Sequence, residues 1–230
     1  MKEVATGIQK PNIILALDVD SLGEVSRFVD LLYPDIKIFK VGIHLFTAFG
    51  PKVVEVIRAK GAEVFLDLKF FDIPNTVANA VRQAVSLKVK MLTVHILGDE
   101  EMLRQAISAA QDESKKQSVT RPLIIGVTVL TSKEVVSSDV LTLASIGIDC
   151  GLDGVVCSAR EAGLLRQNIK KDFVIVTPGI RAEGSQAQDQ KRTATVSEAV
   201  KAGSDYLVVG RPILQASDPA QAAKKLLSLQ

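Results

Sequence analysis

Charged residues of both signs gather at the end of one apolar run, in Asp67-Leu68-Lys69-Phe70-Phe71-Asp72. Side chains two positions apart on a β-strand point to the same side, so we expect Asp67 and Lys69 to share one face. Lys40 ends the preceding apolar run and could join them in an array of alternating carboxylates and ammoniums. Because charges are costly to bury unless they are paired, such an array favours chemistry at a ligand site. The alternative is a structural ion-pair network.

A second group of residues has the chemistry of a phosphate site. Arg211 follows the apolar run 206–209 and can hold a phosphate through two parallel hydrogen bonds, while Gly210 allows the backbone to approach closely. Arg181 and Gln190 lie in the long aperiodic segment 178–195 and could close over a ligand as a lid. Gly210-Arg211-Pro212 also suits a helix start, and both interpretations of Arg211 can hold together.

The histidines and cysteines do not form a metal-binding pattern. His95 is interpreted as a histidine at a strand end rather than a catalyst, and His44 begins an apolar helix face. Cys150 and Cys157 are too few for a disulfide framework and match no zinc spacing, which predicts reduced thiols in a cytosolic protein. We expect Cys157 to pack in the core. The sequence requires no metal.

The elements that must position these groups are eight short apolar runs, separated by segments with helical spacing. The runs are 13–17, 36–41, 63–68, 91–96, 123–127, 154–157, 173–176 and 206–209. They lack strict polar alternation, as is typical of parallel strands covered on both faces. Eight such alternations predict an α/β fold, a (β/α)8 TIM barrel, in which functional side chains follow the strands.

The alternative architecture is an open, doubly wound sheet. The glycine-rich turn expected there after the first strand is missing, and Asp18-Val19-Asp20-Ser21 stands in its place, with Asp20 or Ser21 able to cap the next helix. No linker or composition shift divides the chain, so we predict one domain over residues 1–230.

Composition excludes several classes of protein. With 47% hydrophobic and 23% charged residues, the chain is expected to fold as a soluble globular protein. Its net charge of +2 gives no reason to expect nucleic-acid or membrane binding. The polar start and the lack of a long apolar run predict a protein that is neither exported nor embedded in a membrane.

Several blocks of this sequence closely resemble the orotidine 5'-phosphate decarboxylase family, in its bacterial form. The main one is Phe65-Leu66-Asp67-Leu68-Lys69-Phe70-Phe71-Asp72-Ile73-Pro74-Asn75-Thr76. The others, in order, are Leu15-Ala16-Leu17-Asp18, Phe39-Lys40-Val41-Gly42, Val127-Thr128-Val129-Leu130-Thr131-Ser132, Gly151-Leu152-Asp153-Gly154-Val155-Val156-Cys157-Ser158-Ala159, Thr177-Pro178-Gly179-Ile180-Arg181, Asp189-Gln190-Lys191-Arg192 and Val209-Gly210-Arg211-Pro212. The resemblance covers nearly the whole chain.

The resemblance implies a homodimeric, cytoplasmic barrel that converts orotidine 5'-monophosphate to UMP and CO2, the final step of de novo pyrimidine nucleotide synthesis, without metal or organic cofactor. By this resemblance, Lys69 donates a proton to the ring carbon and Asp67 lies against the departing carboxylate. Lys40 and Asp72 complete the charge array, and Asp72 and Thr76 reach into the partner's site. The other implied substrate contacts are Asp18 and Lys40 at the ribose, Ile73, Thr131 at the pyrimidine, and Arg181, Gln190, Gly210 and Arg211 on the phosphate side.

Three other functions fit parts of the pattern. A sugar-phosphate decarboxylase or hexulose-phosphate synthase would use a similar Asp-x-Lys-x-x-Asp motif to hold magnesium, although Ile73-Pro74-Asn75-Thr76 and the segment 181–190 argue against it. An aldolase would use Lys69 or Lys40 to form a Schiff base. A barrel that only binds nucleotide phosphates would keep the charge array for structural reasons.

Overall fold

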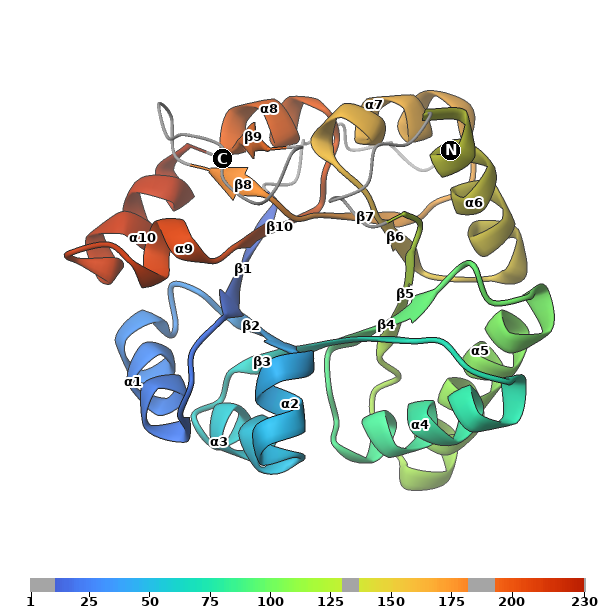
Figure 1. Ribbon diagram of the computed structural model, residues 1–230, viewed down its shortest axis with the longest axis horizontal. Coiled ribbons are helices and arrows are strands. Elements are labelled where there is room, and N and C mark those ends of the chain that lie inside the picture. Colours follow the sequence, from blue (N-terminus) through green and yellow to red (C-terminus); the bar gives the residue numbers. More distant parts are fainter. Residues whose placement is uncertain (1–10, 130–136, 182–192, 230) are drawn as a thin grey trace, which may run out of the picture.

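The computed structural model describes residues 11–129, 137–181 and 193–229. Eight parallel strands close into a barrel in the order β1-β10-β7-β6-β5-β4-β3-β2, and helices surround this ring (Figure 1). The strands are β1 (Asn12–Leu17), β2 (Ile38–Gly42), β3 (Glu63–Phe70), β4 (Met91–His95), β5 (Leu123–Val127), β6 (Gly154–Val156), β7 (Val174–Thr177) and β10 (Tyr206–Val209). The predicted TIM barrel is confirmed, and the open sheet is excluded because β1 pairs with both β2 and β10.

The helices follow the barrel strands along the chain, as the helical spacing predicts. They are α1 (Leu22–Leu32), α2 (Ile43–Phe49), α3 (Lys52–Ala59), α4 (Pro74–Ser86), α5 (Glu100–Gln117), α6 (Ser137–Cys150), α7 (Ala159–Asn168), α8 (Val196–Lys201), α9 (Arg211–Leu214) and α10 (Pro219–Ser228). The start of α1 shows how the sequence sets a helix boundary: Ser21 is the N-cap, and its hydroxyl accepts a hydrogen bond from Glu24 N at 3.2 Å. Ser21 therefore fills the predicted capping role.

Two apolar clusters hold the barrel together. One fills its interior and contains Ile14, Ile38, Phe65, Met91, Ile125, Val176 and Val208, which come from seven of the eight strands. The other packs the outer face of the strands against the helices, with Val25, Phe28, Val29 and Leu32 as the contribution of α1. Because strand side chains alternate between these clusters, residues two positions beyond the interior layer point toward the barrel mouth.

The segment predicted as a long aperiodic loop, 178–195, contains two short strands. They are β8 (Ile180–Arg181) and β9 (Ala194–Thr195), which pair in parallel as a separate sheet. Strands of two residues are too short to produce a hydrophobic period, which is why the sequence pattern does not show them. Residues 182–192, and with them the predicted lid and Gln190, lie outside the described residues.

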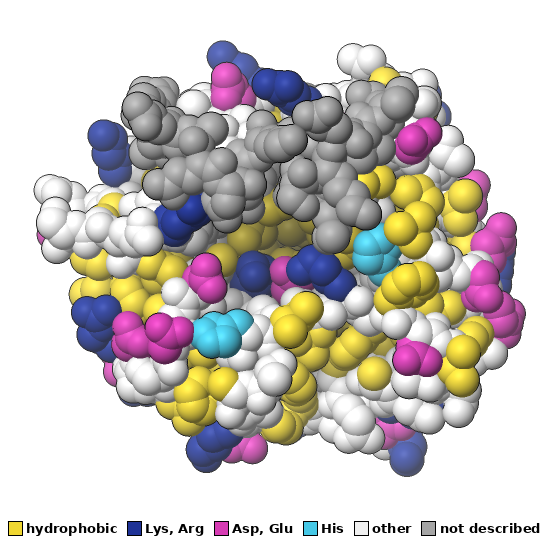
Figure 2. Space-filling view, viewed as in Figure 1, with side chains coloured by type: hydrophobic (Ala, Val, Ile, Leu, Met, Phe, Trp, Pro, Cys, Tyr) yellow, Lys and Arg dark blue, Asp and Glu magenta, His cyan; other side chains and the backbone are white. Residues whose placement is uncertain are grey.

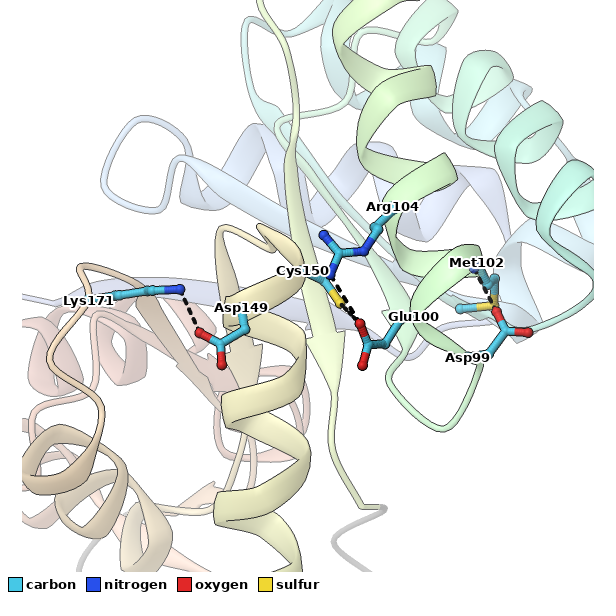
Figure 3. A network of polar contacts seen from close by, with 7 residues as sticks. All are labelled: Asp99, Glu100, Met102, Arg104, Asp149, Cys150 and Lys171. Carbon is cyan, nitrogen blue, oxygen red and sulfur yellow. Dashed lines mark hydrogen bonds and ion pairs between the residues drawn. The ribbon is translucent and has the colours of Figure 1, made fainter.

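Both cysteines are free, as predicted, and both are buried. Cys157 packs in the core, as predicted, and so does Cys150, which ends α6 and whose Sγ lies 3.8 Å from Glu100 Oε2 on α5. Arg104 forms an ion pair with the same carboxylate oxygen at 3.1 Å, so the group joins the two neighbouring helices (Figure 3). None of the helices in the described ranges is long and apolar enough to cross a membrane.

Candidate active site

Three neighbouring strands each place one polar side chain above the apolar interior of the barrel. Ile38, Phe65 and Met91 belong to the interior cluster, and the residues two positions further along are Lys40, Asp67 and Thr93. β2, β3 and β4 are adjacent in the barrel, so these side chains converge at the carboxyl ends of the strands. In a barrel of this kind, that end carries the functional groups.

Asp67 is the centre of this group. Its Oδ2 lies 3.3 Å from the Lys40 ammonium, and its Oδ1 lies 2.9 Å from the Lys69 ammonium. The Thr93 hydroxyl donates a hydrogen bond to Oδ1 at 3.1 Å. Both oxygens of this carboxylate are therefore engaged by cationic or hydrogen-bonding groups, and the predicted association of Lys40, Asp67 and Lys69 is confirmed.

The surroundings of Asp67 determine its protonation. Burial alone would raise the pKa of the carboxyl group, but the nearby ammoniums of Lys40 and Lys69 act in the opposite direction. Hydrogen bonds from Lys69 and Thr93 add to this effect, and the pKa of Asp67 is held below its ordinary value. The side chain is only 13% exposed, so a fixed negative charge is present at neutral pH in a largely buried position.

Lys69 and Asp67 point to the same side, as predicted, but the backbone between them is irregular rather than a regular strand. Lys69 has a φ of 52°, in the left-handed region that costs a non-glycine residue about 1–2 kcal/mol. In the pairing of β3 with β4, Leu66 lies opposite Leu92 but Phe70 lies opposite Val94, so four residue steps on β3 match two on β4. This bulge changes the direction in which the Lys69 side chain leaves the strand.

A cavity of about 530 Å³ opens above these charges. Figure 2 shows basic and acidic side chains gathered in a hollow near the centre of this face. Its lining brings together predicted site residues from distant parts of the sequence: Asp18, Lys40, Asp67, Lys69, Arg181, Gly210 and Arg211. The cavity therefore offers a carboxylate with two ammoniums and, in the same lining, two guanidinium groups suited to an anion.

Three predicted site residues lie away from this cavity within one chain. Asp72, Ile73 and Thr76 are exposed and do not contribute to its lining. The Asp72 carboxylate accepts a hydrogen bond from Ile73 N at 2.7 Å, at the start of α4. A single chain therefore does not bring Asp72 into the charge array. Thr131 and Gln190 lie outside the described residues.

Two features of the site were missed by the sequence analysis. Thr93 is fully buried, and its hydroxyl also accepts a hydrogen bond from Lys69 N at 2.8 Å. The available signal was a single hydroxyl residue inside the apolar run Met91-Leu92-Thr93-Val94. Gly42 lies in the cavity wall, where a Cβ would come within 3.4 Å of the Lys40 ammonium. A larger residue there would crowd that ammonium.

The histidines have the following positions. His95 ends β4, its ring centroid lies 5.6 Å from that of Phe71, and its Nδ1 accepts a hydrogen bond from Leu97 N at 3.4 Å. The interpretation of His95 as a histidine at a strand end is consistent with these contacts. His44 lies on α2 in the cavity lining, and its Nε2 is 3.6 Å from Asp20 Oδ1.

Comparison with known proteins gives the same family over almost the full length of the chain. The model of the orotidine 5'-phosphate decarboxylase / HUMPS family matches residues 11–226. Among curated proteins, the orotidine 5'-phosphate decarboxylase of Vibrio cholerae serotype O1 is 46% identical, covering 95% of this chain and 97% of that protein. The protein of the same name from Coxiella burnetii is 43% identical, covering 94% and 95%.

Solved structures agree with the sequence relatives. A crystal structure of orotidine 5'-phosphate decarboxylase from Lactobacillus acidophilus superposes with a TM-score of 0.83 at 34% identity, covering 96% of this chain and 99% of that one. The enzyme from Pyrococcus horikoshii gives a TM-score of 0.76 at 25% identity, covering 94% and 98%. Fold, cavity residues and full-length similarity lead to one conclusion: the chain belongs to the orotidine 5'-phosphate decarboxylase / HUMPS family.

Proposed function

We propose that this chain converts orotidine 5'-monophosphate to UMP and CO2, the final step of de novo pyrimidine nucleotide synthesis, without a metal or organic cofactor. The observation that carries the proposal is the Asp67 carboxylate held between the Lys40 and Lys69 ammoniums at the bottom of the cavity. Curated relatives at 43–46% identity, all named for this decarboxylase, support it.

The reaction breaks the bond between the pyrimidine ring and its carboxylate. CO2 leaves, the electron pair stays on the ring carbon, and a proton must then reach that carbon. Because the ring offers no obvious electron sink, the site must stabilise the negative charge electrostatically. We assign the proton to Lys69, whose ammonium lies beside Asp67 and is reprotonated from solvent after each turnover.

We propose that the Asp67 carboxylate lies beside the substrate carboxylate that leaves as CO2. Its fixed charge would repel that group in the ground state and stabilise the Lys69 ammonium throughout. This repulsion is ground-state destabilisation, a separate part of the proposal with its own test. A neutral isostere at position 67 that retained full kcat would contradict it.

The cationic residues elsewhere in the cavity suit the substrate phosphate. Arg211 follows β10 and Arg181 lies in β8, and both line the cavity with Gly210. Barrels often hold phosphate after their last two strands, and a guanidinium can bind it through two parallel bonds. We assign Asp18 and Lys40 to the ribose hydroxyls, and Thr131 and Gln190 to the pyrimidine and phosphate by family resemblance.

The test is an ultraviolet assay of orotidine 5'-monophosphate loss by the purified protein. We expect turnover in the original chain and a loss of at least about 10³-fold in Lys69→Ala, because general acid and electrostatic contributions disappear together. Lys60→Ala is the matched control, since Lys60 pairs with Asp30 at 2.7 Å on the surface. Normal turnover in Lys69→Ala would refute the assigned role, and no turnover in the original chain would refute the function.

The family name also covers HUMPS enzymes, so magnesium-dependent sugar-phosphate chemistry is the main competing function. Mg²⁺ binds through carboxylate oxygens and retained waters. In this structure Asp67 Oδ1 and Oδ2 each face an ammonium, which disfavours a divalent cation at the same carboxylate. Turnover that survives EDTA would support our proposal, whereas a strict magnesium requirement would overturn it.

Two further functions are separated by simple experiments. A Schiff-base lysine is activated by an apolar pocket or a neighbouring cation, whereas Lys40 and Lys69 both lie against a carboxylate. Borohydride trapping with a keto substrate would nevertheless reveal an aldolase. A barrel that only binds nucleotides would show UMP binding without any turnover of orotidine 5'-monophosphate.

We also propose that the protein acts as a cytoplasmic homodimer, in which Asp72 and Thr76 contribute to the partner's cavity. Close in sequence to Asp72, the large apolar side chains Phe71 and Ile73 are 60% and 67% exposed. Exposed apolar groups of this size favour an interface. Mixing Asp72→Asn with Lys69→Ala chains should restore activity, because one site of each hybrid receives both intact residues. No recovery after verified subunit exchange would contradict the shared site.

A further inference from the structure

We propose that Thr93 is a positioning residue, whose hydroxyl fixes the relative placement of the Asp67 carboxylate and the Lys69 ammonium. The inference rests on the proposed roles of those two residues. Thr93 lies in the middle of β4 with no exposed surface, directly beside the bulge in β3. It touches the charged groups rather than the cavity, whose lining does not include it.

The Thr93 hydroxyl contacts both Asp67 and Lys69. Thr93 Oγ1 accepts a hydrogen bond from Lys69 N at 2.8 Å and donates one to Asp67 Oδ1 at 3.1 Å. A hydroxyl has one donor and two acceptor positions, so the two bonds are compatible. The same atom therefore holds the backbone of one charged residue and the side chain of the other.

The Lys69 backbone needs such a restraint because of its conformation. Its φ of 52° is in the left-handed region, which a lysine adopts only where its surroundings hold it. Relaxation of this backbone would move the root of the Lys69 side chain, whose ammonium lies 2.9 Å from Asp67 Oδ1. The bond to Thr93 opposes this relaxation directly.

The Asp67 carboxylate is fixed in the same way. Lys69 Nζ and Thr93 Oγ1 both bind Oδ1, whereas Lys40 Nζ faces Oδ2. The two lysines are long and partly exposed, at 19% and 32% of the side-chain surface, so they restrain the carboxylate loosely. Thr93 is the buried, stiff partner, since β-branched side chains have few rotamers.

The competing explanation is that Thr93 only fills space in the barrel. Thr93→Val distinguishes space filling from positioning, because valine keeps the volume and branching but removes the hydroxyl. Thr93→Ser is the complementary variant, since it keeps the hydroxyl and removes the methyl group. Space filling predicts that the serine variant is the more damaged one, and positioning predicts the reverse.

The experiment measures kcat and KM for orotidine 5'-monophosphate in both variants, with Thr128→Val as matched control. Thr128 is a second fully buried threonine, whose hydroxyl donates to Val156 O at 3.0 Å outside the charge array. For Thr93→Val we expect kcat to fall about 10- to 100-fold with KM changed less than about 3-fold, because misplacement by about 1 Å costs this much. Thr93→Ser and Thr128→Val should stay within about 3-fold of the original kcat.

A second measurement does not depend on activity. Amide hydrogen exchange at Lys69 should become at least about tenfold faster in Thr93→Val and stay near the original rate in Thr93→Ser, because only the valine variant loses the acceptor. If the valine variant does not fold, Thr93→Ala replaces it, since alanine and serine differ only in the hydroxyl.

Three results would overturn the inference: an unchanged kcat in the variant without the hydroxyl, an equal loss in Thr93→Ser, or an unchanged exchange rate at Lys69. Failure of the proposed function has a different signature. The original chain would then show no decarboxylation, while the exchange measurement would still decide whether Thr93 holds Lys69.

Discussion

Replacing Asp67 with asparagine should destabilise the protein more than replacing either lysine that faces it. Asparagine keeps the shape of the side chain but removes the negative charge between two ammoniums. At an effective dielectric constant of about 20, Coulomb's law gives attractions of about 5 kcal/mol at 3.3 Å and about 6 kcal/mol at 2.9 Å. The cost of burying the three charged groups offsets much of this.

Breaking a fully buried ion pair costs about 3–5 kcal/mol, and the partial exposure of both lysines lowers that figure here. We expect Asp67→Asn to reduce the free energy of unfolding by about 2–4 kcal/mol, which lowers Tm by roughly 4–16 °C in a chain of this length. Lys40→Met should cost less, because it leaves the neutral pair Asp67–Lys69 rather than two like charges.

The assay is urea unfolding at fixed protein concentration, followed by circular dichroism. Asp30→Asn is the matched control, because the Asp30 carboxylate forms an ion pair with the Lys60 ammonium at 2.7 Å on the surface. A surface ion pair contributes at most about 1 kcal/mol to stability. The reasoning is refuted if Asp67→Asn is as stable as the original chain, or if Lys40→Met is the more destabilised variant.

The contribution of Asp67 to the free energy of unfolding should depend on pH in one direction. The pKa of Asp67 is lowered in the folded protein, because the two ammoniums and the two hydrogen bonds outweigh burial. The stability that Asp67 contributes is therefore fully present above the ordinary aspartate value of about 4 and is lost as the pH falls through the lower folded value. The difference between the original chain and Asp67→Asn should stay constant from pH 7 to about pH 5 and shrink below about pH 4.

Three further outcomes are expected. Arg211→Met should lower kcat/KM for orotidine 5'-monophosphate about 10- to 100-fold, since it removes a charge-assisted phosphate contact, and should leave turnover of phosphate-free orotidine unchanged. Cys150 and Cys157 should react with a disulfide reagent only after unfolding, because burial raises the pKa of both thiols; rapid labelling of the native protein would contradict this. Asp99→Ala should cost about 1 kcal/mol in urea unfolding, because the Asp99 carboxylate caps α5 through Met102 N at 2.7 Å; an unchanged midpoint would count against the cap.

The barrel could be predicted from the sequence because its strands are apolar on both faces. Each of the eight predicted runs coincides with a barrel strand to within two residues at either end. Eight parallel strands joined by helices leave few topologies, and closure of β1 onto β10 selects the barrel. By contrast, β8 and β9 depend on pairing between residues 14 positions apart, from 180 to 194, which no local pattern records.

The three charged residues of the candidate site were predicted from strand alternation, but the backbone that brings Lys69 to Asp67 was not. Lys40 and Asp67 lie two positions beyond interior residues, so the strand period alone places them at the barrel mouth. Lys69 joins them through a bulge and a left-handed backbone, which depend on the partner strand β4 rather than on the sequence of β3. Asp72 is exposed and lies outside the cavity of its own chain, so its proposed role in the site requires a second subunit.

The near-neutral net charge of +2 is compatible with a strong local field, because like and unlike charges are held at fixed distances in the barrel mouth. Electrostatic catalysis needs groups that do not reorganise as charge develops on the substrate. The charges at Lys40 and Lys69 are on flexible side chains, so the rigidity must come from what they contact. Asp67 is mostly buried, and its carboxylate accepts a hydrogen bond from the buried Thr93 on β4. The carboxylate therefore holds a fixed position, and both ammoniums are placed by their contacts with it. The left-handed Lys69 backbone is then held by the site itself, since its N–H lies 2.8 Å from Thr93 Oγ1 while its ammonium lies 2.9 Å from Asp67 Oδ1.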